Sequence, residues 1–205
     1  MTVSPAAAPL PEPGQEPRQE PVREPVREPV REPVRALRLD SPAGNLVVRE
    51  QAGAIVGLAW LRPRQGSEGR SRPAGSGRPS GRPGEPSALL VEAARQLHEY
   101  FAGRRQTFDL PLSPAGSAFH QKVWRRMRDI PFGRTATYGD LACDLGCAAQ
   151  PVGSACAANP IAIVIPCHRV VATTGLGGFS GGAGVESKRF LLHHEGALDP
   201  ELDLF

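Results

Sequence analysis

A cysteine and a histidine are adjacent directly after a long apolar run. The segment Pro166-Cys167-His168-Arg169 follows Ile161 to Ile165, a continuous apolar run that predicts one fully buried strand. A thiolate is a strong nucleophile, and a neighbouring base or a positive environment makes it available near neutral pH. Cys167 is therefore a candidate nucleophile and His168 a candidate base. The alternative is an inert, half-buried pair, the commoner fate of a lone cysteine beside a histidine.

Helices that could present this pair to a ligand lie upstream. A helix is expected from about Ala118 to Asp129, because apolar residues recur there at helical spacing and continue to the next position: Phe119, Val123, Met127 and Ile130. A capping-box pattern, Thr137-x-x-Asp140, predicts a short helix from Tyr138 to Leu145, and Pro151 is well suited to the first turn of another helix that ends near Ala158. Two short helices joined by a short loop predict a helix-turn-helix. By itself such a pair is weak support for DNA binding.

Three strand-like segments and one helix precede those helices. The segments are Ala36 to Asp40, Asn45 to Glu50 and Ala54 to Leu61, and the turns between them favour an antiparallel meander. Ser87 predicts the N-cap of a helix that ends before Gly103. The predicted fold class is therefore α+β: a small N-terminal domain of antiparallel sheet and helix, followed by a mainly helical domain that contains the helix-turn-helix.

Two segments rich in proline and glycine divide the chain. The 205 residues include 23 Gly and 22 Pro, concentrated at 1–36, where Glu-Pro-Val-Arg repeats, and in the Arg-rich stretch 62–86. Neither segment has enough apolar residues for a core, so we expect both to be disordered. The predicted organisation is a tail (1–36), an N-terminal domain (37–117) interrupted by the 62–86 insertion, a C-terminal domain (118–198) and a tail (199–205).

Composition and charge narrow the class of protein. No run of roughly 18 apolar residues is present, and the N-terminus lacks the pattern of a secretory signal, so we expect a cytoplasmic protein with no membrane partner. The four cysteines, all between positions 143 and 167, are expected to be free thiols. The formal net charge is only +3, but 62–86 and 118–135 each carry a surplus of basic residues that could face phosphates.

A series of motifs surrounds Cys167. Asn159-Pro160 is followed by Ile163-Val164-Ile165-Pro166-Cys167-His168-Arg169-Val170; the flanking motifs are Thr137-Tyr138-x-x-Leu141-Ala142, Ser180-Gly181-Gly182 and His194-Glu195-Gly196. In this order and spacing they resemble the O6-alkylguanine-DNA alkyltransferases, also called methylated-DNA–protein-cysteine methyltransferases. The resemblance covers about 39–197 apart from the insertion. Several motifs at family spacing are far more specific than any one of them.

That resemblance implies a DNA repair protein that acts on double-stranded DNA. It would bind the minor groove through the helix-turn-helix and rotate an O6-alkylguanine, or an O4-alkylthymine, out of the stack. Cys167 would accept the alkyl group irreversibly, so each molecule would act once. His168 would draw the thiol proton through a water molecule, and Glu195 would orient and charge the imidazole.

Further residues would bind the extruded base. By the same resemblance, Tyr138 and Ser180 would donate hydrogen bonds to the guanine, where negative charge develops as the alkyl carbon departs. The carbonyl groups of Cys167 and Val170 would accept from its exocyclic amine. Asn159 would tie the recognition helix to the active-site turn.

Some positions depart from the family's pattern. Gln150 stands where the family usually has the arginine that enters the stack, so we expect weaker flipping or weaker DNA affinity. Phe179 replaces a commoner tyrosine, and the segment 182–188 is about two residues longer than usual, which leaves the matching of Ser180 and Lys188 to family positions open. Gln150 and Arg169 are the residues expected to contact DNA.

No metal or other cofactor is expected. Some family members hold zinc in the N-terminal domain through Cys and His, but no cysteine precedes Cys143 in this chain. Cys143 and Cys147 lie one helical turn apart and are expected to be buried packing. We expect a monomer with no obligate protein partner.

Two other functions stay open at this point. A non-catalytic lesion sensor would flip and hold the base without transfer, which requires Gln150 or the altered loop to disable Cys167. A thiol hydrolase would use Cys167 and His168 but would leave the helix-turn-helix without a purpose.

Overall fold

The computed structural model describes residues 32–61 and 86–198. Apart from their ends at 32–36 and Pro86, the predicted N-terminal tail and Arg-rich insertion lie outside the described residues, as does the tail after 198. The described residues belong to one compact unit. The division into two domains at Ser117 therefore stays a prediction.

The first described residues form a three-stranded antiparallel sheet. Strands β1 (Arg35–Leu39), β2 (Leu46–Gln51) and β3 (Ala54–Trp60) pair in the order β1-β2-β3, which confirms the predicted meander. β1 begins inside the range assigned to the tail. The turn after β1 is closed by the amide of Gly44, which donates to the carbonyl of Ser41 at 2.9 Å, and Gly44 has a φ of +103° that favours glycine.

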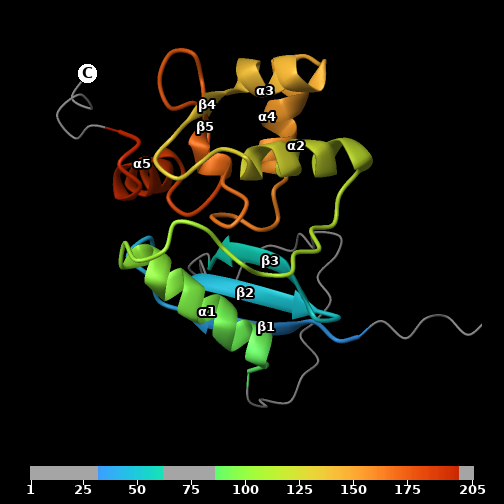
Figure 1. Ribbon diagram of the computed structural model, residues 1–205, viewed down its shortest axis with the longest axis vertical. Coiled ribbons are helices and arrows are strands. Elements are labelled where there is room, and N and C mark those ends of the chain that lie inside the picture. The colour runs from blue at the N-terminus through green and yellow to red at the C-terminus, as the bar shows by residue number, and fades with distance from the viewer. Residues whose placement is uncertain (1–31, 62–85, 199–205) are drawn as a thin grey trace, which may run out of the picture. The chain divides into compact units, whose positions relative to one another are not determined.

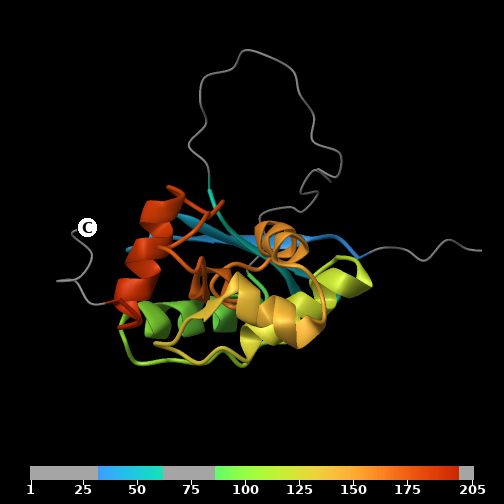
Figure 2. The same cartoon turned by 90° about the horizontal axis from the view of Figure 1, so that it is seen from above.

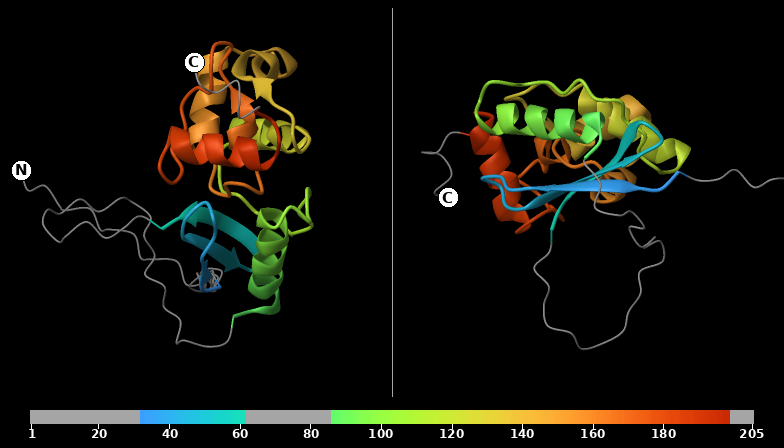
Figure 3. Two further views of the ribbon diagram at one scale, coloured as in Figure 1. Left: turned by 90° about the vertical axis from the view of Figure 1, so that its left-hand side faces the viewer. Right: turned by 90° about the horizontal axis from the view of Figure 1, so that it is seen from below.

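Helix α1 (Ala88–Phe101) lies along one face of this sheet (Figures 1 and 3) and packs against β2. Ser87 caps the helix as predicted, with its hydroxyl accepting from the amide of Leu90 at 3.2 Å. The buried side chains of the helix are Leu90, Ala93, Gln96, Leu97 and Tyr100. Each fully buried leucine contributes about 1.5–3 kcal/mol to the stability of this layer.

Helix α2 (Ala118–Arg128) confirms the next predicted helix and is capped by the Ser117 hydroxyl. Its Trp124 is fully buried, and the indole Nε1 donates to the carbonyl of Ala155 at 2.8 Å. A Cβ added at Gly116 would lie 2.5 Å from the Trp124 ring, so only glycine fits beside it. The tryptophan thereby ties α2 to the helix that carries Ala155.

Helices α3 (Tyr138–Leu145) and α4 (Ala149–Ala157) form the predicted pair of short helices, and both pack on α2 (Figure 1). The predicted capping box is present: Thr137 and Asp140 each accept from the other's backbone amide. α4 starts at Ala149, so Pro151 lies in its first turn, as predicted. Proline is tolerated there because the first turn of a helix has no internal acceptors for its amides.

The apolar run from Ile161 to Ile165 is fully buried but is not a strand, so that prediction was wrong. Ile161 makes a single bridge with Leu58, and the residues after it form turns. Ile163 has a φ of +70°, rare for a β-branched residue, and the amide of Ile165 donates back to the carbonyl of Ile161 at 2.9 Å. An apolar run indicates burial, and burial alone does not require an extended backbone.

Strand β3 holds this turn in place. The amide of Leu58 donates to the carbonyl of Pro160, and the amide of Ala162 donates to the carbonyl of Leu58, both at 2.9 Å. The sheet therefore fixes the segment that leads into Cys167.

The remaining elements were not predicted. A 3-10 turn η1 (Cys167–Arg169) leads into β5 (Val170–Val171), which pairs in parallel with β4 (Ala136–Thr137), and α5 (Val185–His194) follows. β4 and β5 lie between α5 and the group α2–α4 (Figure 1), and Figure 2 shows the same separation of α5 from that group. No helix in the described part of the chain is long and apolar enough to cross a bilayer.

Candidate active site

Cys167 is the first residue of η1, at the end of the buried turn that β3 holds. It is only 8% exposed, yet it lines two cavities of about 730 and 440 Å³. A thiol at this point is fixed by rigid backbone and accessible from open space. That combination suits a nucleophile whose substrate reaches it by entering a cavity.

Asn159 joins the end of α4 to this turn. Its Nδ2 donates to the carbonyl of Ile165 at 2.7 Å, and its Oδ1 accepts from the amide of Ile161 at 3.0 Å. The same side chain also acts to lower the pKa of the Cys167 thiol. The structure thus places Asn159 between the end of α4 and the turn that carries Cys167.

The side chains of His168 and Glu195 meet in the interior. Nε2 of His168 lies 2.8 Å from Oε1 of Glu195, and both side chains are fully buried. The same carboxylate accepts from Arg169, with Nε 2.8 Å from Oε2 and Nη2 3.0 Å from Oε1. The hydroxyl of Tyr100, on α1, donates to Oε1 at 2.7 Å.

These contacts determine the protonation of the pair. Burial raises the pKa of Glu195, but hydrogen bonds and charge from His168 and Arg169 outweigh it and hold the pKa at about 2. Burial lowers the pKa of His168, although Glu195 acts in the opposite direction. At neutral pH the carboxylate is therefore ionised and the imidazole neutral, with its proton on Nε2 facing Glu195. Nδ1 is left with the lone pair, and this buried atom has no hydrogen-bond partner among the described residues.

Cys167 itself is held in its neutral form. Burial raises the pKa of the thiol, while the side chain of Asn159 and the charge of Lys188 act in the opposite direction. The resting thiol therefore needs a base before it can act as a nucleophile. The lone pair on Nδ1 of the adjacent His168 is the basic group that the turn supplies.

Lys188, on α5, is fully buried, and its charge acts on the thiol. Its Nζ donates to the carbonyls of Val170, Leu176 and Gly178 at 2.6, 2.5 and 3.4 Å, which matches the three donors of an ammonium group. The carbonyl of Val170, predicted to accept from a base, thus already accepts from this lysine. The ammonium also lies 5.8 Å from the centre of the Tyr138 ring.

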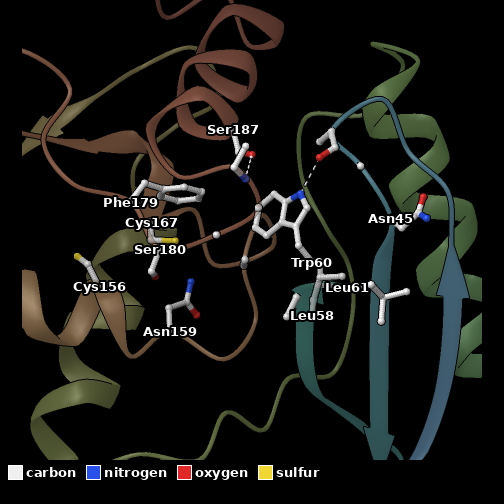
Figure 4. Close-up of a pocket in the computed structure, with 17 residues that line it drawn as sticks. Asn45, Leu58, Trp60, Leu61, Cys156, Asn159, Cys167, Phe179, Ser180 and Ser187 are labelled. Carbon is white, nitrogen blue, oxygen red and sulfur yellow. Dashed lines mark hydrogen bonds between the residues drawn. The ribbon is translucent and has the colours of Figure 1, made fainter. Parts of the chain in front are cut away.

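Trp60, at the end of β3, forms a wall of the larger cavity (Figure 4). Its Nε1 donates to the carbonyl of Ala43 at 2.7 Å, and its ring packs edge-on against Phe179 with the centroids 5.8 Å apart. A Cβ at Gly181 would lie 2.5 Å from the indole, so the loop that carries Ser180 can approach Trp60 only because that position is glycine. The sheet thereby shapes one side of the space that reaches Cys167.

Tyr138 and Ser180 line the smaller cavity together with Cys167. The hydroxyl of Tyr138 lies 3.4 Å from the carbonyl of Gly178, and burial raises its pKa to about 12, so it remains a donor at neutral pH. Ser180 is exposed at the edge of both cavities. The structure therefore brings the predicted donors to the same space as the thiol.

The two residues predicted to contact DNA differ in their placement. Gln150 is exposed at the second position of α4. Arg169 is only 6% exposed, and besides contacting Glu195 its Nη1 donates to the carbonyl of Ile130 at 2.7 Å. A guanidinium held in this way does not present its charge to a DNA backbone, so we correct the role of Arg169 to one of holding Glu195.

Tyr100, Lys188 and Trp60 were not identified as site residues from the sequence. Tyr100 follows Leu97 at helical spacing, which indicates only that it faces the core. Lys188 was noticed only as the end of an unusually long loop, and Trp60 only as part of a strand. No local pattern connects any of the three with Cys167.

No group of three or more His, Cys, Asp or Glu side chains within residues 32–61 and 86–198 could hold a metal ion. Cys143 is exposed, so the prediction that it is buried packing was wrong, whereas Cys147 is half-buried and packs against the core. The helix that carries Cys143, α3, buries Leu141 and Ala142 instead.

Comparison with known proteins gives consistent matches over both halves of the chain. A family model described as 6-O-methylguanine DNA methyltransferase, ribonuclease-like domain, matches residues 36–114. A second, described as 6-O-methylguanine DNA methyltransferase, DNA binding domain, matches residues 118–197. The two matched ranges include every candidate site residue described above.

Individual relatives agree with these models. A constitutive methylated-DNA–protein-cysteine methyltransferase of Bacillus subtilis is 36% identical over 167 residues, covering 76% of this chain and 92% of the relative. The methylated-DNA–protein-cysteine methyltransferase of Methanosarcina acetivorans is 46% identical over 116 residues, covering 55% of this chain and 73% of the relative.

Solved structures show the same likeness. The crystal structure of Mycobacterium tuberculosis O6-methylguanine methyltransferase matches with a TM-score of 0.61 at 34% identity, over 82% of this chain and 95% of that one. The structure of M. tuberculosis OGT in complex with DNA matches with a TM-score of 0.62 at 35% identity, over 78% and 91% of the two chains.

Proposed function

Because the chain belongs to the 6-O-methylguanine DNA methyltransferase family, and is thus a DNA-binding repair protein that transfers alkyl groups from DNA to a cysteine, we propose that Cys167 is the acceptor. The proposed substrate is O6-alkylguanine in double-stranded DNA, with O4-alkylthymine as a second lesion. The observation that carries this proposal is the Cys167 thiol, which opens onto two cavities and adjoins the buried pair of His168 and Glu195.

The first step is removal of the thiol proton. Nδ1 of His168 takes it, either directly or through one water molecule, and the imidazolium that forms is stabilised by the carboxylate of Glu195 at 2.8 Å. The charge of Lys188 stabilises the thiolate. Asn159 keeps the turn, and with it the sulfur, in one position.

The second step is in-line displacement at the alkyl carbon. The sulfur–carbon bond forms as the bond between carbon and guanine O6 breaks, and the electron pair of the broken bond goes to the base. Tyr138 and Ser180, beside the smaller cavity, donate hydrogen bonds to the departing guanine. Because a thioether does not return the alkyl group, each molecule acts once.

The lesion must leave the duplex to reach this site. Cys167 is 8% exposed at the base of the cavities, whereas O6 of a stacked guanine lies inside the double helix. We propose that α3 and α4 bind the DNA as a helix-turn-helix and that exposed Gln150 lies against the gap left by the base. The two-domain division at Ser117, the monomeric state and the cytoplasmic location expected from the sequence are also part of this proposal.

The test is incubation of the full chain with a duplex that contains one O6-methylguanine, followed by peptide mass spectrometry of all four cysteines. We expect one methyl group per molecule, on the Cys167 peptide alone. Cys167→Ser should transfer nothing, whereas Cys143→Ser, the same change at an exposed cysteine, should behave as the wild type. Binding of the duplex without methylation would instead indicate a lesion sensor, and a methyl group on another cysteine would refute the assignment of Cys167.

A further inference from the structure

Tyr100 belongs to the N-terminal region of the chain but contacts the site around Cys167. It is fully buried on α1, and its hydroxyl donates to Oε1 of Glu195 at 2.7 Å, although 95 residues separate the two in sequence. At the next residue back from Glu195, Nε2 of His194 lies 2.7 Å from the carbonyl of Tyr100, and their rings are 4.9 Å apart. The last turn of α1 and the end of α5 are thus joined by adjacent contacts.

The donors to Glu195 come from two directions. His168 and Arg169 are neighbours on η1, and both draw the carboxylate toward that turn. Among the described residues, Tyr100 is the donor to Glu195 that comes from another element. Burial and the negative charge of Glu195 raise the pKa of Tyr100, so its hydroxyl keeps its proton and acts as a donor.

We propose that Tyr100 is a positioning residue of the transfer reaction: its hydroxyl holds Oε1 of Glu195 where that oxygen accepts from Nε2 of His168, which leaves Nδ1 to take the proton of Cys167. The proposal rests on the function proposed above for Cys167 and His168. It assigns the N-terminal α+β region a part in the chemistry.

The consequence for pH follows from the groups that face His168. Glu195 favours the imidazolium, Arg169 and Lys188 disfavour it, and Tyr100 acts by drawing charge from the shared carboxylate oxygen. Without the hydroxyl, Glu195 keeps more of its charge for His168, so the pKa of His168 rises. His168 accepts a proton only when neutral, so the pH below which transfer slows should move upward.

The experiment measures the rate of methyl transfer from an O6-methylguanine duplex across the acid range, together with the NMR titration of ¹⁵N-labelled His168 in the full chain. Tyr100→Phe keeps the ring and removes only the donor; we expect both the rate profile and the titration to move up by about half a pH unit or more. Replacing Tyr100 by 3-fluorotyrosine strengthens the donor and should move both in the opposite direction.

Ala93→Gly is the matched control. Ala93 is buried on the same helix but does not contact Glu195, so this change weakens α1 and should leave both pH values where they are. The proposal is overturned if Tyr100→Phe leaves either pH value unchanged, or if Ala93→Gly moves them as much. If the wild type places no methyl group on Cys167, the proposed function fails, whereas the His168 titration still decides whether Tyr100 tunes that imidazole.

Discussion

Replacing Glu195 by glutamine tests the central feature of the site, which is a buried carboxylate whose side-chain partners are all hydrogen-bond donors. The amide of glutamine offers one oxygen in place of two and adds two N–H donors. It would face the guanidinium of Arg169, the hydroxyl of Tyr100 and Nε2 of His168, all of which are donors in the native protein. Arg169 would then be a buried cation without a counter-charge.

Two arguments give the same magnitude for the loss. Breaking a buried ion pair by removing one partner costs about 3–5 kcal/mol. Independently, the pKa of Glu195 is held at about 2 instead of 4.5, and at about 1.4 kcal/mol per pH unit this difference corresponds to roughly 3.5 kcal/mol of stability. Because the folded-state pKa is lowered, that stability is present above about pH 4.5 and is lost as the pH falls toward 2.

Urea unfolding of wild type and Glu195→Gln at pH 7 and in the acid range measures both effects. We expect the variant to lose about 3 kcal/mol or more at pH 7, and its stability to depend less on pH below 4.5. Glu186→Gln is the control, because Glu186 is exposed on the same helix and lies 3.8 Å from Arg189; we expect a change within about 0.5 kcal/mol. A Glu195→Gln variant as stable as wild type, or with the same acid dependence, would show that this carboxylate does not hold the site together.

Three further substitutions test other parts of the site. Gln150→Arg should speed repair of duplex DNA by about tenfold through an added cationic contact and affect reaction with free O6-benzylguanine much less; equal effects on both substrates would contradict a role in flipping. Gly181→Ala should cost about 1–3 kcal/mol in urea unfolding, because the new methyl would meet Trp60 at 2.5 Å, and adding Trp60→Ala should make the two changes clearly non-additive. Lys188→Met removes the donor from three carbonyls and the positive charge near the thiol. We expect the free energy of unfolding to fall by about 2 kcal/mol or more and Cys167 to be alkylated more slowly, as measured by peptide mass spectrometry. An unchanged rate of alkylation would show that the lysine is structural only.

Local patterns in the sequence predicted most helices and strands. The cap at Ser87, the capping box at Thr137 and the turn before Gly44 act between residues only a few positions apart, and all have their expected role. Cys167 and His168 are likewise neighbours in the sequence, so their proximity needs no tertiary contact. The apolar run after Pro160 indicates only that its residues are buried, and there the local conformation was predicted wrongly.

The sequence by itself therefore determined the elements up to α4 other than β4, their order and the chemical groups present, because propensities, caps and apolar spacing depend on near neighbours. Only the tertiary structure decided which distant groups meet: Tyr100 with Glu195, Lys188 with the carbonyl of Val170, and Trp60 with the loop at Gly181. Such contacts depend on how helices and sheet pack, and packing sums many weak interactions that no short stretch of sequence contains. For the same reason Arg169, which by its motif could face DNA, proved to be buried against Glu195.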